Sequence, residues 1–234
     1  MKIARLYKMK DFIHKEYPKS CDPNDFFVQV KRTVNGKPVS QEQINMIVDS
    51  IMNGLQLKSN DVMFDLGCGN GALSMLMFSF MKKYHGIDFS EFLVEVAKKN
   101  FEKQDFTFEI AEANSYMNEV ASNPEYTKAL CYGVFSYFDR NMAENILRKI
   151  FNKFTNISRF YIGNIPDKNR VDKFFYKGID YTKLIHDTQS AIGIWWTEDE
   201  FRELASKTGW NVEFIHMPAN FYSAHYRFDL VLSR

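Results

Sequence analysis

The sequence predicts an α/β protein built on a doubly wound parallel sheet with helices on both faces. Short apolar runs of strand length alternate with segments of helical periodicity from residue 40 onward. The first clear strand breaks into glycines at alternate positions, which is typical of a sharp strand-to-helix turn. With 234 residues, 45% of them hydrophobic, the chain can bury one full core.

The chain is expected to divide at residue 40 into a covering segment, residues 1–39, and a main domain, residues 40–234. Ser40 is expected to cap a helix, because an apolar stripe of helical spacing follows it. The stripe comprises Ile44, Ile47, Val48, Ile51 and Leu55. Residues 165–196 are too long for a bare connection and are expected to form an insertion on the substrate side of the domain.

The glycine-rich turn follows a buried strand at residues 62–66. Gly67, Gly69 and Gly71 remove side chains where the chain must bend, so that a ligand can lie against the backbone. The residues that follow predict a helix whose free N–H groups point at that ligand. Its apolar positions are Ala72, Leu73, Met75, Leu76, Met77 and Phe80.

The later elements continue the alternation of strands and helices. Strands are expected at residues 84–88, 106–110, 127–132, 160–164, 212–216 and 226–232. A helix begins after Ser90, and another covers residues 141–154. Thr197 and Glu200 form a capping box that opens a last helix, which Gly209 ends.

Two acids beside the glycine turn indicate which ligand it holds. Gly67, Gly69 and Ala72 satisfy the dinucleotide-binding pattern literally, but that pattern alone is weak. Asp65 lies two residues before the first glycine, where a negative charge favours a cationic amino-acid ligand over a phosphate. Asp88 ends the next strand, where a carboxylate can accept hydrogen bonds from both ribose hydroxyls.

An acid followed by alternating glycines resembles the first motif of class I S-adenosylmethionine-dependent methyltransferases. The resemblance covers residues 40–234 and implies a Rossmann-like seven-stranded sheet, with six parallel strands and the last one antiparallel. It implies that the glycine loop faces the methionine half of S-adenosylmethionine and that Asp88 holds its ribose. Glu112 and Ala113 resemble the motif that flanks adenine, although Asp is usual where Glu112 stands. The cofactor-binding residues expected from the resemblance are Asp65, Gly67, Cys68, Gly69, Asp88, Phe89, Glu112, Ala113 and Gly133.

The substrate is expected outside the carboxyl ends of the strands, where ligands bind in such sheets. Three segments rich in aromatic residues can form its walls: residues 1–39, 165–196 and 218–225. Packing of an added layer is the alternative role for most of their rings. The residues expected to bind the acceptor are Arg32, Tyr181, Trp196 and Tyr222.

Methyl transfer from a sulfonium is an in-line displacement in which the protein mainly aligns the reactants. A general base is needed only for a poorly ionised hydroxyl acceptor. His225 is the first candidate and His186 the second, because imidazole titrates near neutral pH, and Tyr137 is the third. A structural role is the alternative for each, and His14, His85 and His216 are less suited.

Missing motifs narrow the acceptor further. Methyltransferases of nucleic-acid amino groups carry Asn/Asp-Pro-Pro-aromatic after the fourth strand, where this chain has residues 133–136 (Gly-Val-Phe-Ser). The acids of the metal-dependent catechol type are missing as well, so no metal is expected. A net charge of +1 argues against a large nucleic-acid footprint.

The bulk properties suggest a cytoplasmic protein. Three isolated cysteines suit a reducing compartment, and no secretory or membrane-spanning segment is expected. We therefore expect a monomeric or homodimeric methyltransferase that acts on a small molecule, at oxygen before nitrogen or carbon. The stand-alone bacterial enzymes of surface-glycan and natural-product pathways are the nearest analogy. An NAD-dependent oxidoreductase and a non-catalytic cofactor-binding partner protein are the alternatives.

Overall fold

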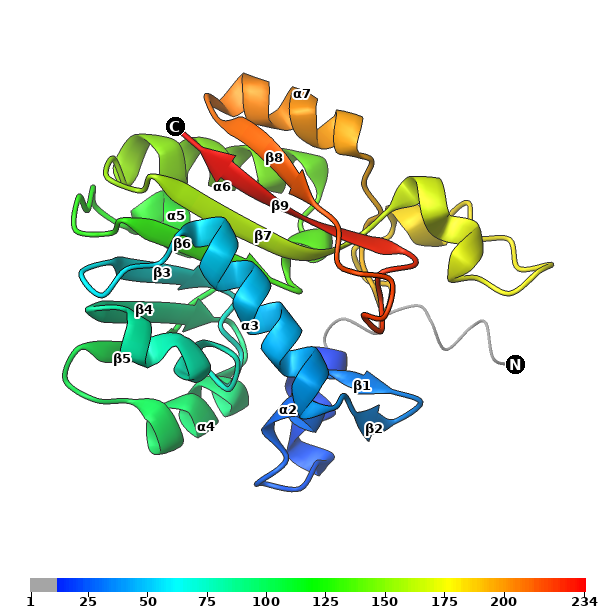
Figure 1. The fold of residues 1–234 in the computed structure, drawn as a ribbon, viewed down its shortest axis with the longest axis horizontal. Coiled ribbons are helices and arrows are strands. Elements are labelled where there is room, and N and C mark those ends of the chain that lie inside the picture. Colours follow the sequence, from blue (N-terminus) through cyan, green and yellow to red (C-terminus); the bar gives the residue numbers. More distant parts are fainter. Residues whose placement is uncertain (1–11) are drawn as a thin grey trace.

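The computed structural model describes residues 12–234 and contains a seven-stranded sheet in the order β5-β4-β3-β6-β7-β9-β8 (Figure 1). Its strands are β3 (Val62–Leu66), β4 (Lys83–Asp88), β5 (Phe106–Ile110), β6 (Lys128–Tyr132), β7 (Arg159–Pro166), β8 (Asn211–Ile215) and β9 (Arg227–Ser233). The first five are parallel to one another, and β9 lies antiparallel between β7 and β8. Since β8 is antiparallel to β9, it runs in the same direction as β7. The predicted fold of six parallel strands and one inserted antiparallel strand is therefore confirmed.

Helices cover both faces of this sheet because successive residues of each buried strand point to opposite sides. The helices are α3 (Gln41–Leu55), α4 (Glu91–Phe101), α5 (Ala113–Glu119), α6 (Arg140–Lys153) and α7 (Glu198–Thr208). Phe64 packs into the core formed with α5, α6 and α7, whereas its neighbour Met63 packs into the core formed with α3 and α4. Figure 1 shows α3 crossing the near face of the sheet.

The predicted helix signals work largely as expected. The Ser40 hydroxyl accepts the Gln43 N–H at the start of α3. Thr197 and Glu200 form the predicted capping box of α7, and Gly209 ends that helix at a φ of 89°. Ser90 holds the cap position of α4, but its side chain makes no cap hydrogen bond.

The predicted helix after the glycine turn is wrong in type. Residues Ser74–Phe80 form the 3₁₀ helix η4, which has three residues per turn. Ser74, Met77 and Phe78 are buried in this element, while Met75 and Phe80 are 36% and 45% exposed. Met75 and Phe80, which were expected among the apolar positions of the helix, therefore lie on its exposed side.

The segment before α3 folds onto the glycine turn in short elements. They are η2 (Phe12–Glu16), η3 (Pro18–Ser20), α2 (Phe26–Gln29) and the hairpin of β1 (Thr33–Val34) and β2 (Lys37–Pro38). The Asn70 carboxamide, in the glycine turn, donates to Phe26 O and to Gln29 Oε1 at 2.8 and 2.9 Å. Ser90 Oγ donates to His14 O at 2.7 Å, so the segment is attached at two points. Residues 1–11 of the predicted covering segment lie outside the described residues.

The predicted insertion after β7 contains η6 (Lys168–Lys173) and η7 (Leu184–His186) and projects beside the sheet (Figure 1). A small apolar cluster holds it together. That cluster comprises Val171, Ile185 and Trp195, with Phe175, Tyr181, Ile192 and Tyr226 packed against it. None of the helices over residues 12–234 is long and apolar enough to cross a bilayer.

Candidate functional site

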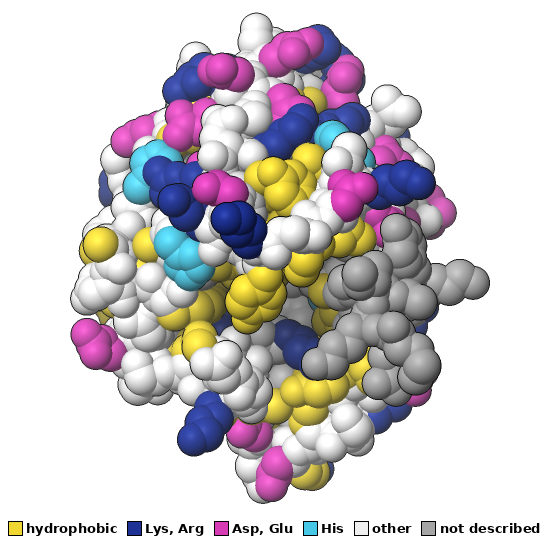
Figure 2. Space-filling model, turned by 90° about the vertical axis from the view of Figure 1, so that its right-hand side faces the viewer, with side chains coloured by type: hydrophobic (Ala, Val, Ile, Leu, Met, Phe, Trp, Pro, Cys, Tyr) yellow, Lys and Arg dark blue, Asp and Glu magenta, His cyan; other side chains and the backbone are white. Residues whose placement is uncertain are grey.

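Two adjoining cavities lie at the carboxyl ends of the parallel strands. The larger has about 770 Å³ of empty space, part of it open to solvent, and the smaller about 550 Å³. His14, Gly67, Asp88 and Val134 line both, so the two cavities meet at these residues. Figure 2 shows apolar side chains around a hollow on this side of the molecule. Because acids and bare backbone border one cavity and mainly apolar side chains border the other, the joined cavities suit an elongated ligand with chemically different halves.

Backbone conformation and packing both exclude side chains at alternate positions of the glycine turn. Gly67, Gly69 and Gly71 all have positive φ, at 83°, 55° and 74°. A Cβ atom on Gly67 would lie 2.5 Å from the Val134 side chain, and one on Gly71 would lie 2.8 Å from Phe108. Both the backbone conformation and the packing therefore require glycine, and the bare backbone of Gly67 and Gly69 faces the larger cavity.

Asp88 connects the end of β4 to the glycine turn. Its two oxygens accept backbone N–H groups, Oδ2 from Gly69 at 2.9 Å and Oδ1 from Ser90 at 2.8 Å. Burial raises the pKa of this carboxyl, while the backbone donors act in the opposite direction. Each carboxylate oxygen has a further lone pair, so Asp88 can accept a pair of vicinal hydroxyl groups at the junction of the cavities.

Asp65 places a second buried carboxylate in the larger cavity. Its Oδ2 accepts the Ser74 hydroxyl at 2.5 Å and the Tyr84 hydroxyl at 2.7 Å. Among the described residues, no side chain or backbone group donates to Oδ1, which leaves this oxygen for a ligand. Burial raises the pKa of Asp65 to about 6, and the two hydroxyl donors lower it. A cationic ligand would favour the ionised form.

The smaller cavity is mostly apolar and suits a flat heterocycle. Ile87, Phe89, Ala111, Ala113, Tyr137 and Phe138 contribute to its lining. Glu112 also lines it, but its carboxylate accepts the Ser115 N–H at 2.9 Å and caps α5. This capping role accounts for an acid at a position where the resemblance left the function of Glu112 open.

All nine residues expected to bind the cofactor line one or both of these cavities. Asp65, Gly67, Cys68, Gly69 and Gly133 line the larger, Phe89, Glu112 and Ala113 the smaller, and Gly67 and Asp88 both. The sequence analysis missed Ser74 and Tyr84, which hold the Asp65 carboxylate. Tyr84 is the first residue of the predicted strand that ends at Asp88. Its side chain lies on the same face of the sheet as that of Asp65, because Tyr84 pairs with Met63, two residues before Asp65. This register could not be predicted from the sequence.

Of the four residues expected to bind the acceptor, two line the larger cavity. Arg32 reaches it from the N-terminal segment, and Tyr222 from the loop between β8 and β9. Tyr222 is held by its backbone N–H, which donates to Gln43 Oε1 at 2.8 Å. Asn164 of β7 also lines this cavity, and the sequence analysis did not select it as a binding residue.

The expectation for Trp196 and Tyr181 is not met. Trp196 is 1% exposed and packs between Phe135 and Phe201 in the core, with the Arg140 guanidinium 3.4 Å from its ring centroid. Tyr181 packs in the cluster of the insertion, its ring stacked on that of Phe175. Neither residue lines the two cavities, because the insertion uses its rings to build its own core.

The three candidates for a general base are not placed to act as one. His225 and His186 are exposed and line neither cavity. Tyr137 lines the smaller cavity, but its hydroxyl donates to Ala191 O at 2.8 Å. Burial raises the pKa of Tyr137 to about 12, so it binds its proton too tightly to act at neutral pH. His14, judged less suited from sequence, is the histidine that lines both cavities.

The part of the chain from residue 12 onward contains no group of three His, Cys, Asp or Glu side chains arranged to hold a metal ion.

Comparison with known proteins agrees with this geometry. The model of a family described as "Methyltransferase domain" matches residues 57–209, which include both acids and the glycine turn. A protein of Methanocaldococcus jannaschii, described as probable cobalt-precorrin-6B C(15)-methyltransferase (decarboxylating), is 31% identical over 68 residues. The match covers 29% of this chain and 36% of that protein, so it spans only about a third of that relative's length.

Solved structures share the fold at low sequence identity. Magnesium protoporphyrin IX methyltransferase from Synechocystis, with bound S-adenosylmethionine, has a TM-score of 0.61 at 16% identity, covering 97% of this chain and 95% of that one. An S-adenosylmethionine-dependent methyltransferase from Clostridium acetobutylicum has a TM-score of 0.59 at 11% identity, covering 83% and 92%.

Proposed function

The chain belongs to the methyltransferase-domain family, and on this premise we propose that it transfers a methyl group from S-adenosylmethionine to a small-molecule acceptor. The two joined cavities would hold the cofactor with its adenine against Phe89 and Ala113 and its ribose on Asp88. The ammonium group of its aminobutyrate tail would pair with Asp65. The cofactor's sulfonium would then lie near the junction of the cavities.

The observation that carries this proposal is the environment of Asp65. Both protein hydroxyls donate to its Oδ2, and the carboxylate is 2% exposed in a cavity floored by glycines. The pyrophosphate of a dinucleotide would meet this buried negative charge at close range, which is unfavourable. A cation at the same place would be attracted. The site therefore favours a sulfonium-containing amino acid over NAD, the ligand of the oxidoreductase alternative.

The residues of this site mainly bind and align. S-adenosylmethionine supplies an activated methyl carbon, so the chain needs no covalent intermediate of its own. Asp65, Asp88 and the backbone of the glycine turn would fix the donor, and the N-terminal segment and the 218–225 loop border the cavity. Alignment of this kind can contribute on the order of 7 to 11 kcal/mol to lowering the barrier.

An oxygen of a small molecule is the acceptor we favour. The N-terminal segment and the loop that carries Tyr222 both border the larger cavity, which restricts the space left for an acceptor. The two relatives whose names state a substrate, a precorrin and a protoporphyrin, support a small molecule. Surface-glycan and natural-product precursors are the acceptor classes we propose, and a free monomer or a homodimer is the state in which the protein would act.

A hydroxyl acceptor must release a proton, and His14 is our candidate to receive it. It lies at the junction of the two cavities, with its ring 4.8 Å from that of Tyr137 and 5.9 Å from that of Phe89. Neutral imidazole can accept a proton near pH 7. His225 and His186 are replaced in this role because they are exposed outside the cavities.

The experiment that tests the function uses methyl-labelled S-adenosylmethionine. The purified protein is incubated with the labelled cofactor and a metabolite extract of its host, and labelled products are identified by mass. Asp88→Ala serves as the control that should lose cofactor binding and transfer together. Calorimetry should show binding of S-adenosylhomocysteine and none of NAD. Binding without transfer to any acceptor pool would favour the non-catalytic partner protein, and binding of NAD alone would contradict the proposal.

A further inference from the structure

Arg32 is half-buried, and two of its guanidinium nitrogens lack a hydrogen-bond partner among the described residues. These two atoms, Nε and Nη1, are buried. The guanidinium lies 4.8 Å from the ring centroid of Tyr132 and borders the larger cavity. Leaving donors of a charged group unpaired and out of water is costly, and a planar guanidinium matches an oxyanion with two parallel donors.

A second donor beside this cavity is fixed in position by an unusual backbone. Asn164 has a φ of 67°, in the left-handed region, at a register shift between β7 and β9. Its N–H donates to Asp229 Oδ1 at 2.6 Å, and its carbonyl oxygen accepts from Arg227. A Cβ on Gly133 would lie 3.4 Å from Asn164 Nδ2, so the carboxamide lies next to the end of β6. Asparagine adopts this conformation more readily than most residues with a Cβ, so the bend holds the carboxamide at a defined place.

Arg32 and Asn164 lie toward the β6 and β7 end of the cavity, away from the acid that would bind the cofactor's ammonium group. Arg32 lowers the pKa of the Tyr132 phenol, against the larger effect of burial, so the two groups are close. Asp65 belongs to β3, which lies on the other side of β6 from β7.

We propose that Arg32 and Asn164 form an oxyanion subsite that binds a carboxylate or phosphate group of the methyl acceptor. This inference rests on the proposed function and specifies its substrate class: an anionic small molecule. The oxyanion would take two parallel hydrogen bonds from the guanidinium, from Nη2 together with either Nε or Nη1, and Asn164 Nδ2 would add a third donor. The anion would anchor the acceptor at one end while its hydroxyl faces the methyl donor at the other.

The subsite can be tested without knowing the acceptor. Protein saturated with S-adenosylhomocysteine is titrated with inorganic phosphate, followed by ³¹P NMR, and with ¹³C-labelled acetate, followed by ¹³C NMR. At least one probe should bind the wild type, and Arg32→Gln should weaken that binding by about tenfold or more. Arg32→Lys, which keeps the charge but not the fork, should recover part of it.

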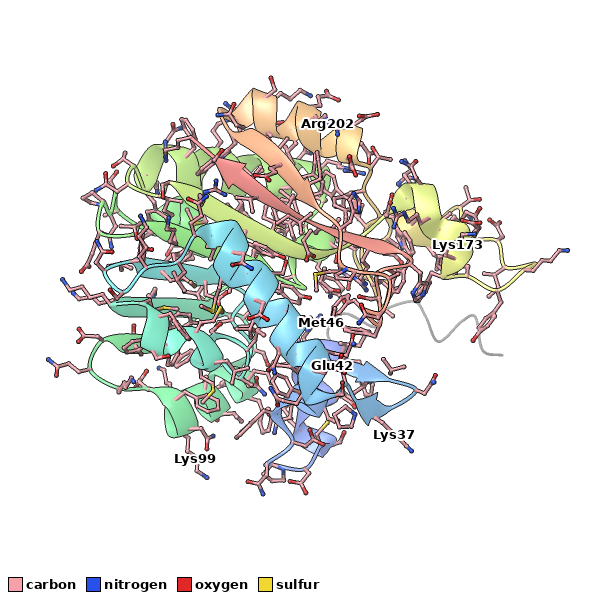
Figure 3. All side chains as sticks on the ribbon, viewed as in Figure 1. Lys37, Glu42, Met46, Lys99, Lys173 and Arg202 are labelled. Carbon is pink, nitrogen blue, oxygen red and sulfur yellow. The ribbon has the colours of Figure 1, made fainter. Side chains whose placement is uncertain are left out.

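Two more variants control for charge and for folding. Lys37→Gln makes the same change in net charge within the same segment, but Figure 3 shows the Lys37 side chain directed away from the body of the protein. It should leave probe binding unchanged. Asn164→Asp places a negative charge at the proposed subsite and should weaken both probes even if Arg32→Gln does not fold. Wild-type protein that binds neither probe would overturn the proposal.

A further outcome distinguishes the acceptor from the cofactor's own carboxylate. 5′-Methylthioadenosine lacks the aminobutyrate group of S-adenosylhomocysteine. Should Arg32→Gln weaken S-adenosylhomocysteine but not 5′-methylthioadenosine, Arg32 holds the cofactor and the proposal is wrong. Probe binding that depends on Arg32, in a protein that transfers no methyl group, would support the subsite and contradict the proposed function.

Fractionating the metabolite extract shows whether the acceptor carries a phosphate or a carboxylate. Acceptor activity should be retained on an anion exchanger and be missing from the unretained fraction. Loss of activity after phosphatase treatment of the retained fraction identifies a phosphate, and survival of activity identifies a carboxylate. Activity only in the unretained, uncharged fraction would contradict an anionic acceptor.

Discussion

At the scale of single residues, Asp65 links cofactor binding to pH. Burial raises the pKa of its carboxyl to about 6, whereas hydroxyl donation from Ser74 and Tyr84 lowers it. Below that pH the acid is neutral and cannot pair with an ammonium group. The affinity for S-adenosylhomocysteine should therefore fall by up to about tenfold for each pH unit below 6. Calorimetric titrations of wild type and Asp65→Asn from pH 5 to 8 check this, and equal slopes for both would contradict it.

The same carboxyl should affect the stability of the unliganded protein in the opposite direction. Because its pKa is higher in the folded chain than the ordinary value of 3.8, the folded state binds the proton more tightly. The ionised carboxyl therefore destabilises the folded state above pH 6. The free energy of unfolding should gain from its protonation as the pH falls from above 6 toward 4. Denaturant unfolding of wild type against Asp65→Asn isolates it, since other buried acids, Asp88 and Asp229, are common to both proteins.

His14 gives the second prediction at this scale. If it receives the acceptor's proton, His14→Gln should lower kcat by on the order of a hundredfold while cofactor affinity stays nearly unchanged. The exposed His186 and His225 provide matched controls, and their replacement by Gln should leave kcat unaltered. If either control loses kcat and His14→Gln does not, the general base is the histidine replaced in that control, as first expected from the sequence.

At the scale of elements, the glycine turn is limited by both conformation and space. Gly71 has a φ of 74°, and a Cβ there would lie 2.8 Å from the Phe108 ring. Gly71→Ala should therefore lower the free energy of unfolding by about 2 to 4 kcal/mol, measured by urea denaturation. Gly178 also has positive φ, but a Cβ there would have no atom within 4 Å. Gly178→Ala should therefore lower the free energy of unfolding only by the cost of the strained backbone conformation. Equal losses would show that packing against Phe108 contributes nothing.

The 3₁₀ helix after this turn shows where element-level prediction fails. The sequence of residues 72–80 is apolar apart from two serines, so it cannot reveal which helical period will apply. The start of the element is tied by a hydrogen bond from Ser74 to Asp65 of β3, a residue outside the segment. The composition of the segment does not indicate this contact.

At the scale of the whole molecule, the N-terminal segment forms part of the site. Gln29 and Asn70 are each 1% exposed, and their carboxamides hydrogen-bond to each other at 2.9 Å. Gln29 Nε2 also donates to the carbonyls of Asp22 and Pro23 at 3.2 Å. These bonds attach the segment to the glycine turn, so closure of the cavity and cofactor binding should be coupled.

This coupling predicts a local effect of Gln29→Glu, which removes the amide donor while keeping the size of the side chain. Amides of residues 12–39 should lose protection in hydrogen exchange, and S-adenosylhomocysteine should dissociate faster, while the sheet remains protected. Gln41→Glu is the matched control, because Gln41 is exposed and its carboxamide donates to Asn45 of its own helix. Loss of protection spread evenly over the chain would instead indicate global destabilisation.

The fold and the family follow from short, local patterns in the chain. Asp65, the alternating glycines and Asp88 are local in the chain, and the backbone geometry that they need is local as well. The strand lengths, the Ser40 cap and the capping box of α7 follow from short-range hydrogen bonds in the same way. For this reason the predicted topology is confirmed, and every residue expected to bind the cofactor lines the cavities.

Which distant side chains reach the cavities depends on how remote segments pack together. Trp196 and His225 have the chemistry of site residues, but one is buried in the core and the other is exposed at the surface. Arg32, His14 and Asn164 border the cavities because the N-terminal segment folds back and β7 bends at its bulge. Such placements depend on contacts between segments far apart in the chain, and of these three residues only Arg32 was selected from the sequence.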